Sequence, residues 1–160
     1  KAQEIQPLKL GDKLPDAFWQ QEYTIYKDGK TTSQNLAAYK GKLLILDFWA
    51  TWCSTCYHKF PYLDSLNKVR GENLGLMMVN TIQTKDDLTK IKIRLNKYAS
   101  GKPFGLPSIY NDQYLVKLFP HGMLSHYVWI NKLGIVVAFT GSDFINDTNI
   151  NLSIARFAKP

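Results

Sequence analysis

The sequence lacks the features of a membrane-spanning, repetitive or disulfide-rich protein. No apolar run approaches the roughly 18 to 20 residues that a membrane-spanning helix needs, and there are no internal repeats or low-complexity tracts. Cysteine occurs only twice in 160 residues, so at most one internal disulfide can form. The chain begins at Lys1 without an initiator methionine or an apolar signal core, from which we expect a mature or trimmed product. These absences leave one globular domain with enough residues for a core.

Positive charge exceeds negative charge, since 20 Lys and Arg against 13 Asp and Glu give a net charge of +7. Such a surface can attract nucleic acid or an anionic membrane. The lysines are scattered along the chain, as at Lys9, Lys59 and Lys132, rather than gathered in one block. We therefore interpret the charge as an ordinary solvated surface and expect no nucleic-acid partner.

The most informative stretch runs from Leu43 to Pro61, LLILDFWATWCSTCYHKFP. Residues 43–47 are typical of a buried strand that ends in one acid. Both cysteines follow, three residues apart, where the pattern changes from continuously apolar to helical. Two thiols at this spacing can close a small disulfide ring or supply half of a metal site. The stretch by itself leaves both options open.

Apolar periodicity and turn residues predict further elements on both sides of this stretch. Further strands are expected at residues 22–26, 74–81, 105–110, 127–130 and 135–139. Helices are expected at residues 32–39, 54–70, 88–98, 112–119 and 150–157, with Pro61 kinking the second and a linker at 100–103. A helix between two strands makes them parallel, whereas the turn at residues 131–134 makes a hairpin. Together they predict one three-layer α/β/α domain with a mixed sheet over residues 1–160, of which residues 1–20 form an extended arm.

Several of these residues together resemble the thioredoxin superfamily, and closely its TlpA/ResA-type extracytoplasmic thiol–disulfide oxidoreductases. Residues 48–56, FWATWCSTC, match the active-site signature of that family almost letter for letter. Pro61 stands five residues after the second cysteine, as the family's helix-kinking proline does. Residues 10–16 (LGDKLPD), 28–30 (DGK) and 134–136 (GIV) match its opening, its lead-in to the first core strand and its final hairpin. The resemblance covers nearly the whole chain and implies a thioredoxin-like fold.

The resemblance implies a redox-active pair in which Cys53 attacks and Cys56 resolves. Cys53 lies at the expected N-terminus of a helix, where the amides of Thr55 and Cys56 and the helix dipole would favour a thiolate. Thiol–disulfide exchange needs that thiolate as its nucleophile. Cys56, one turn further in, should be shielded and ready to attack a mixed disulfide. We expect no cofactor other than the Cys53–Cys56 disulfide, and no metal.

Four residues near the cysteines are expected to contribute. Asp47, six residues before Cys53, resembles the family's buried acid, which would have a raised pKa and exchange a proton with the resolving thiol. An acid at a strand end can instead point to solvent. Trp52 would shield the sulfur and present a flat docking face, or simply pack in the core. Ser54 and Thr55 would tune the redox potential and contact the substrate.

One position departs from the family pattern. The family has a cis-proline opposite the cysteines, just before the penultimate strand, and aligning residues 127–130 with that strand places Ser125 there. The backbone before it, at Leu124, would pair with a bound peptide. A serine holds a cis bond at about 3 kcal/mol more than proline. We therefore expect a trans bond, a remodelled loop or altered substrate docking at Leu124 and Ser125.

A non-catalytic interpretation keeps the same fold. Zinc can be bound by two cysteines and two histidines, so Cys53 and Cys56 could share a metal with two of His58, His121 and His126. The pair could also be a structural disulfide, and the chain would then be a binding module. His58 follows Cys56 by two residues and points away on a helix, whereas His126 could approach the sulfurs.

The resemblance implies thiol–disulfide exchange with protein thiol and disulfide substrates, in the direction of a reductase. It also implies a periplasmic or otherwise extracytoplasmic location, with anchoring through a removed N-terminal segment as one option and a membrane protein as electron donor. We expect a monomer. No residue in the sequence names the substrate, and an oxidase direction stays open.

Overall fold

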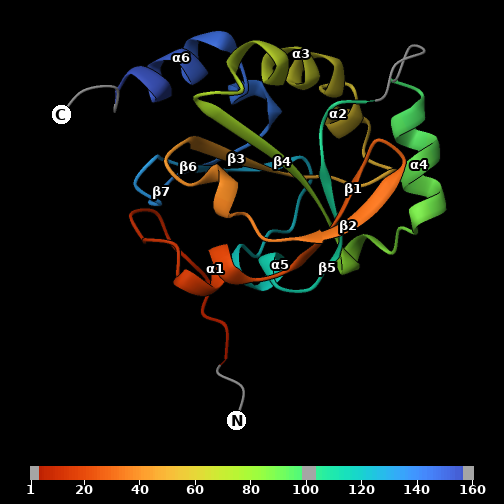
Figure 1. Ribbon diagram of the computed structural model, residues 1–160, viewed down its shortest axis with the longest axis horizontal. Coiled ribbons are helices and arrows are strands. Elements are labelled where there is room, and N and C mark those ends of the chain that lie inside the picture. The colour runs from red at the N-terminus through yellow and green to blue at the C-terminus, as the bar shows by residue number, and fades with distance from the viewer. Residues whose placement is uncertain (1–3, 99–103, 157–160) are drawn as a thin grey trace.

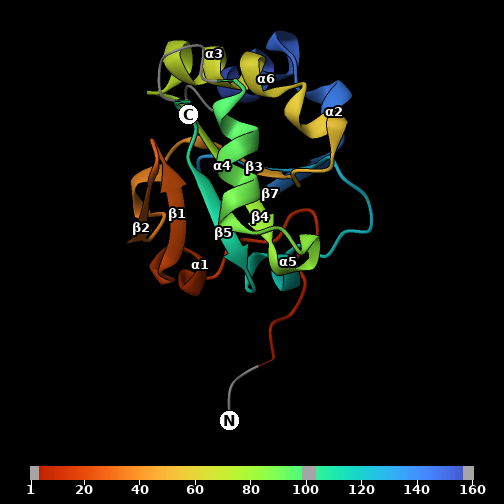
Figure 2. The ribbon, with the colours of Figure 1, turned by 90° about the vertical axis from the view of Figure 1, so that its right-hand side faces the viewer.

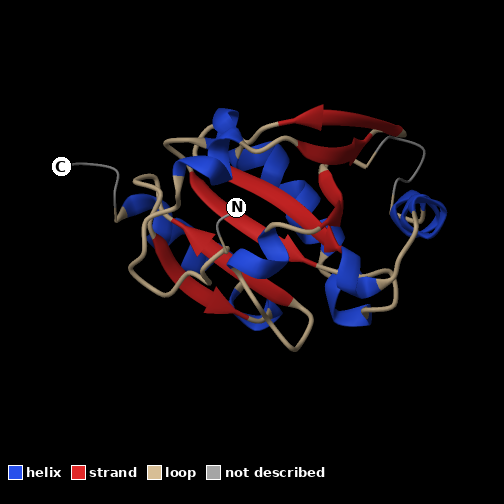
Figure 3. Cartoon of the chain, turned by 90° about the horizontal axis from the view of Figure 1, so that it is seen from below, coloured by secondary structure: helices blue, strands red, loops and turns tan. Residues whose placement is uncertain are grey.

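A seven-stranded mixed sheet forms the middle of the molecule (Figure 1). This computed structural model describes residues 4–98 and 104–156. The strands lie in the order β2-β1-β5-β4-β3-β6-β7, and they fan out because the sheet twists (Figure 3). Their bounds are Tyr23–Lys27 (β1), Lys30–Gln34 (β2), Leu43–Phe48 (β3), Leu74–Thr81 (β4), Ser108–Asp112 (β5), His126–Ile130 (β6) and Val136–Thr140 (β7).

Helices cover both faces of the sheet, which confirms the predicted three-layer α/β/α architecture (Figures 1 and 2). One apolar core joins α3, α4 and α6 to one face, and a second joins α1 and α5 to the other. No helix in the described part of the chain is long and apolar enough to span a membrane. The helices are Asp16–Gln20 (α1), Ser54–Tyr57 (α2), Phe60–Arg70 (α3), Leu88–Asn96 (α4), Leu115–Leu118 (α5) and Asp147–Ala155 (α6), with short 3-10 turns at Ala37–Tyr39 (η1), Ile82–Thr84 (η2) and Ser142–Phe144 (η3).

The central strand β3 positions the candidate site. All six of its residues are buried, and it pairs parallel with β4 and antiparallel with β6. The two crossovers toward β4 and β5 pass over the same face, through α3 and α4, as right-handed connections require. Side chains alternate along a strand, so Leu46 and Phe48 face α1 and α5, whereas Ile45 and Asp47 face α3. β3 therefore brings one carboxyl group to the face that also carries the cysteines.

The predicted helix at residues 32–39 is wrong, because strand pairing decides this segment. Asp28 and Gly29 have positive φ values of 53° and 80° and form the tight turn of a hairpin. The following residues pair with β1 as β2, and their threonines suit an extended backbone. Only Ala37–Tyr39 is helical, as the 3-10 turn η1.

Smaller differences concern the predicted arm and the helix after Cys53. The last five residues of the arm form α1, which buries Phe18 and Trp19 in the second core. The helix after Cys53 is divided into α2 and α3, with Pro61 in the first turn of α3, where a proline fits without loss of a helical hydrogen bond. Val69, near the C-terminal end of α3, is exposed. The predicted linker at residues 100–103 lies outside the described residues.

A substitution at Gly75 of β4 tests how closely the turn η1 packs on this sheet. A methyl group on Gly75 would clash with the ring of Tyr39. We expect Gly75→Ala to lower the free energy of unfolding by about 1 to 3 kcal/mol, as overpacked cores do. Urea unfolding measures this loss, and Gly141→Ala is the matched control because nothing lies within 4 Å of its added Cβ. In a Tyr39→Ala background the Gly75→Ala loss should vanish, because the clashing ring is gone. An equal loss with and without the Tyr39 ring would show that this clash is not its cause.

Candidate active site

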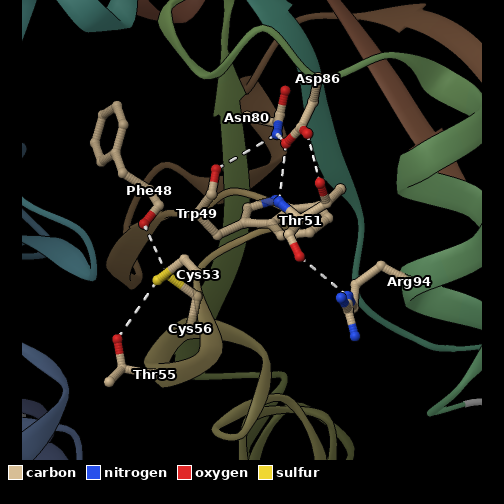
Figure 4. The surroundings of a disulfide bond; sticks show 9 residues. All are labelled: Phe48, Trp49, Thr51, Cys53, Thr55, Cys56, Asn80, Asp86 and Arg94. Atoms are coloured by element: carbon tan, nitrogen blue, oxygen red, sulfur yellow. Dashed lines mark hydrogen bonds between the residues drawn. A yellow bond between two sulfur atoms is a disulfide. The ribbon is translucent and has the colours of Figure 1, made fainter.

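Cys53 and Cys56 form a disulfide between the end of β3 and the start of α2, with their Cα atoms 5.3 Å apart (Figure 4). β4 pairs with one side of β3 and β6 with the other, so the pair lies at a switch point at the carboxyl end of a strand, where α/β folds place their sites. Cys56 is fully buried, whereas Cys53 is 6% exposed. Cys53 is therefore the more accessible sulfur, in the order that the sequence predicts.

The hydrogen bonds around the pair differ in part from the expected ones. The amides of Cys56 and Tyr57 donate to the Cys53 carbonyl, at 3.1 and 3.3 Å, so the Cys56 amide does not serve the sulfur. The Thr55 hydroxyl lies 3.4 Å from Cys53 Sγ (Figure 4). Ser54 is exposed beside it. In the disulfide form, the Thr55 hydroxyl is therefore a polar contact of the outer sulfur.

The loop between β3 and Cys53 is tied to Asp86, a residue that precedes α4. The Asp86 carboxylate accepts hydrogen bonds from the Thr51 amide (2.8 Å), the Thr51 hydroxyl (2.5 Å) and the Asn80 side chain (2.9 Å), as Figure 4 shows. The Thr51 carbonyl accepts a hydrogen bond from Arg94 Nε of α4 at 3.1 Å. The backbone that leads into Cys53 is therefore held by polar contacts on both sides of one residue.

Aromatic side chains complete the surroundings of the pair. Trp49 is fully buried and donates its indole N–H to the Ser108 hydroxyl. Trp52 is 64% exposed, and its indole N–H donates to the Thr84 carbonyl at 3.1 Å. The Arg94 guanidinium lies 4.0 Å from the centroid of the Tyr57 ring, where a cation–π contact joins α4 to α2. Trp52 therefore presents a fixed aromatic surface next to Cys53.

Asp47 is 2% exposed and lies on the face of the sheet that carries the cysteines. Within the described residues, neither of its carboxylate oxygens has a hydrogen-bond partner. Burial raises the pKa of Asp47 well above its usual range. The carboxyl group therefore points inward, as the resemblance implies, and not to solvent.

The loop before β6 closes the site from the opposite side. The peptide bond between Leu124 and Ser125 is cis, so the trans bond that the sequence analysis offered for this position is wrong. Leu124 also lines a groove of about 260 Å³ that Trp52, Thr84, Gly122 and the 80% exposed Met123 share. The predicted substrate-contacting residues Trp52 and Leu124 are thus brought together at one groove, while Ser54 and Thr55 lie on α2.

The histidines take no part in a cluster with the cysteines. His121 and His126 stack with ring centroids 4.8 Å apart and pack on Phe48, on the face opposite to the disulfide. Burial, together with the neighbouring His121, lowers the pKa of His126 to about 4. His58 is exposed. In residues 4–98 and 104–156, no three His, Cys, Asp or Glu side chains lie close enough to hold a metal.

Sequence reasoning missed Asp86, Arg94 and Tyr127. The bond between Asp86 and Thr51 spans 35 positions of the chain, so no local pattern indicates it. Tyr127 lies opposite Asp47 in the β3–β6 register, so its place at the site depends on strand pairing. The buried acid in an apolar strand was the one available signal, since an acid so placed needs a polar neighbour.

Asp86→Ala should loosen the loop that carries the cysteines. The change leaves the buried Thr51 amide and the Asn80 side chain without their acceptor. We expect a loss of about 2 to 4 kcal/mol in the free energy of unfolding, measured by urea, because bonds to a carboxylate are strong and orphaned donors are costly. Asp87→Ala is the control: it removes the α4 cap bond to the Lys90 amide and should cost about 1 kcal/mol. Equal losses of unfolding free energy in the two variants would contradict the assignment that Asp86 holds the loop before Cys53.

Asp47→Asn should stabilise the protein, and more so as the pH rises. The folded-state pKa of Asp47 is raised, so its contribution to stability is full below the ordinary carboxyl pKa and is lost as the pH rises through the folded value. Asparagine removes this loss because it carries no charge. We expect a gain of about 1 to 3 kcal/mol at pH 8, the range for a buried unpaired polar group, and little gain near pH 4. Urea unfolding from pH 4 to pH 8 measures the gain in unfolding free energy. A gain that does not depend on pH would contradict the raised pKa of Asp47.

Sequence comparison finds relatives that are named as thiol–disulfide proteins. The sequence profile of the Redoxin family matches residues 9–104. The chain is 30% identical over 71 residues to thiol-disulfide oxidoreductase ResA of Geobacillus kaustophilus (44% of this chain, 41% of that protein). It is 44% identical over 48 residues to thiol:disulfide interchange protein DsbE of Vibrio cholerae (30% of this chain, 25% of that protein). These matches thus span less than half the length of the curated relatives.

Solved structures share the fold over most of the chain. The thioredoxin domain of a thiol-disulfide oxidoreductase from Bacteroides vulgatus superposes with a TM-score of 0.63 at 18% identity, covering 95% of this chain and 99% of that one. The exposed lipoprotein thioredoxin Etrx1 of Streptococcus pneumoniae gives a TM-score of 0.62 at 24% identity, covering 84% and 98%. At these identities the likeness concerns the thioredoxin-like fold.

Proposed function

This chain belongs to the Redoxin family, within the thioredoxin superfamily, and we propose that it catalyses thiol–disulfide exchange on extracytoplasmic proteins, as a reductase. The observation that carries the proposal is the Cys53–Cys56 disulfide at the start of a helix, next to Trp52, which lines an apolar groove. Relatives with the names thiol-disulfide oxidoreductase and thiol:disulfide interchange protein support the same reaction.

The reaction follows from the order of the two sulfurs. In the reduced protein the Cys53 thiolate attacks a substrate disulfide, and one substrate sulfur leaves as a thiolate. Cys56 then attacks Cys53 Sγ, the second substrate sulfur leaves, and the Cys53–Cys56 disulfide is restored. Asp47, behind the pair, accepts the proton of the Cys56 thiol when that sulfur attacks. Two electrons pass from the protein to the substrate, and a separate donor must return them.

The groove supports a protein as the substrate. Trp52 and Met123 expose apolar surface, and Leu124, which precedes Ser125, lines the same groove. An extended peptide could lie along this surface with its disulfide against Cys53, in contact with Ser54 and Thr55 on α2. A membrane protein as electron donor, a place outside the cytoplasm with or without an anchor, and a monomeric state complete the proposal; they rest on the resemblance to TlpA/ResA-type proteins.

Cysteine variants test the proposed order of attack. The wild-type protein should reduce insulin in the presence of dithiothreitol, and Cys53→Ser should abolish this activity because the nucleophile is lost. Cys56→Ser should instead trap a mixed disulfide between Cys53 and the substrate, visible by mass spectrometry of the intact complex. The reverse pattern, or an active Cys53→Ser protein, would contradict the assignment.

The reduction potential of the Cys53–Cys56 pair tests whether electrons pass from the protein to its substrate, as in a reductase. A reductase should equilibrate with glutathione at about −200 to −270 mV, the range of glutaredoxins and thioredoxin. A value near the −120 mV of strong oxidants would overturn the reductase assignment while leaving the exchange reaction in place.

A further inference from the structure

One side chain of α4 contacts the chain on both sides of the cysteine pair. Arg94 Nε donates a hydrogen bond to the carbonyl of Thr51, two residues before Cys53, at 3.1 Å (Figure 4). The guanidinium carbon of the same side chain lies 4.0 Å from the centroid of the Tyr57 ring, and Tyr57 directly follows Cys56. We call these two contacts the Arg94 clamp, because they join the loop that enters the pair to the helix α2 that leaves it.

The other backbone contacts around the pair are local. The amides of Cys56 and Tyr57 donate to the Cys53 carbonyl at 3.1 and 3.3 Å, and the Cys53 amide donates to the Ala50 carbonyl at 3.1 Å. These bonds shape α2 and the turn before it, each within four residues. The bond from Arg94 comes from a different element and spans 43 positions of the chain.

A guanidinium suits this position. Its plane can stack on an aromatic ring while its edge donates to a carbonyl, whereas a lysine ammonium is a point charge without such a plane. Within the described residues, no carboxylate forms an ion pair with Arg94. The side chain is half-buried, so its charge is held by a ring and a carbonyl that both belong to the segments beside the cysteines.

We propose that Arg94 is a positioning residue, which keeps Cys56 within reach of Cys53 after the disulfide has been reduced and so favours the disulfide over the dithiol. The inference rests on the proposed thiol–disulfide exchange. Neither contact of the Arg94 clamp involves a sulfur atom, so both are compatible with a reduced pair.

The clamp acts on the step in which Cys56 resolves the mixed disulfide. The Cys56 thiol proton passes to Asp47, as proposed above, and Cys56 Sγ bonds to Cys53 Sγ. The substrate sulfur leaves as a thiolate with the electron pair of its former bond to Cys53. Thiols held near the geometry of the product have a high effective concentration toward each other. A dithiol so held is oxidised more readily, which is the direction of a reductase.

Arg94→Gln removes both contacts of the clamp. We expect the effective concentration of the two thiols to fall about 3- to 10-fold. Because a tenfold change is 29.6 mV for two electrons, the reduction potential should rise by about 14 to 30 mV. Equilibration with glutathione measures it: the protein disulfide and two glutathiones give the dithiol and one oxidised glutathione.

The sign of this shift separates the clamp from the charge of Arg94. A nearby positive charge stabilises the Cys53 thiolate, so its loss alone would disfavour the reduced protein and lower the potential. Tyr57→Leu removes the ring contact, leaves the guanidinium in place, and should also raise the potential. In the double variant the rise should be smaller than the sum of the two, because either change frees the loop from α2.

The rate of the resolving step gives a second measurement. Dithiodipyridine is an uncharged aromatic disulfide that releases one thione when Cys53 of the reduced protein attacks and another when Cys56 resolves. Arg94→Gln and Tyr57→Leu should both slow the second release about 3- to 10-fold. In Tyr57→Leu the first release should not change, because the charge of Arg94 remains.

Lys92→Gln is the matched control. Lys92 lies on the same helix, and its ammonium is 6.0 Å from the centroid of the Tyr26 ring of β1. The change therefore also removes one positive charge and one cation–π contact, but neither residue belongs to the segments beside the cysteines. The reduction potential and the second release should match those of the wild-type protein.

The outcomes are distinct. If wild-type protein shows no second release, the proposed function fails. If it does and either Arg94→Gln or Tyr57→Leu fails to raise the potential, the positioning role alone is wrong. An equal rise in Lys92→Gln would also overturn it, since the cause would then be the charge of α4. Should Arg94→Gln not fold, Tyr57→Leu decides by itself.

Discussion

Asp47 is an acid near the end of a fully buried strand, with no hydrogen-bond partner for either oxygen among the described residues. Such a group costs free energy in its charged form, and nothing around it offsets the cost. The rest of the site is arranged about this constraint. Because strand residues alternate, placing Asp47 on the face of α3 also places Phe48 and its histidine neighbours on the other face. The disulfide and the acid therefore share one apolar core.

A second carboxyl group near the same loop has the opposite surroundings. Asp86 accepts three hydrogen bonds and fixes the backbone at Thr51, whereas Asp47 accepts none. Two acids of the same chemistry thus differ in their neighbours, which give Asp86 a structural role and leave Asp47 free for the proton transfer that we propose. Holding the loop at Asp86 keeps Cys53 in place without bringing a fixed charge beside Asp47. The acid behind the sulfur can then respond to the state of the cysteines.

Much of this arrangement could be predicted from local sequence. Continuous apolar runs gave β3 and β4 nearly residue for residue, and Asn131 to Gly134 marked the final hairpin. The segment from Thr32 to Tyr39 failed, because helix-like spacing was outweighed by pairing with β1, which only the folded chain provides. For the same reason the opposition of Tyr127 to Asp47 was out of reach: it depends on the register of strands 80 positions apart, as the numbering of the pair shows. The motif located the cysteines and the acid, and long-range pairing supplied what surrounds them.

The loop from His121 to Ser125 joins the groove to the second apolar core. Its Met123 and Leu124 line the groove. The stack of His121 and His126 on Phe48 holds both ends of this loop against the core on the far face. A peptide bound in the groove would therefore cover Leu124 and lie against a loop that is anchored on the core.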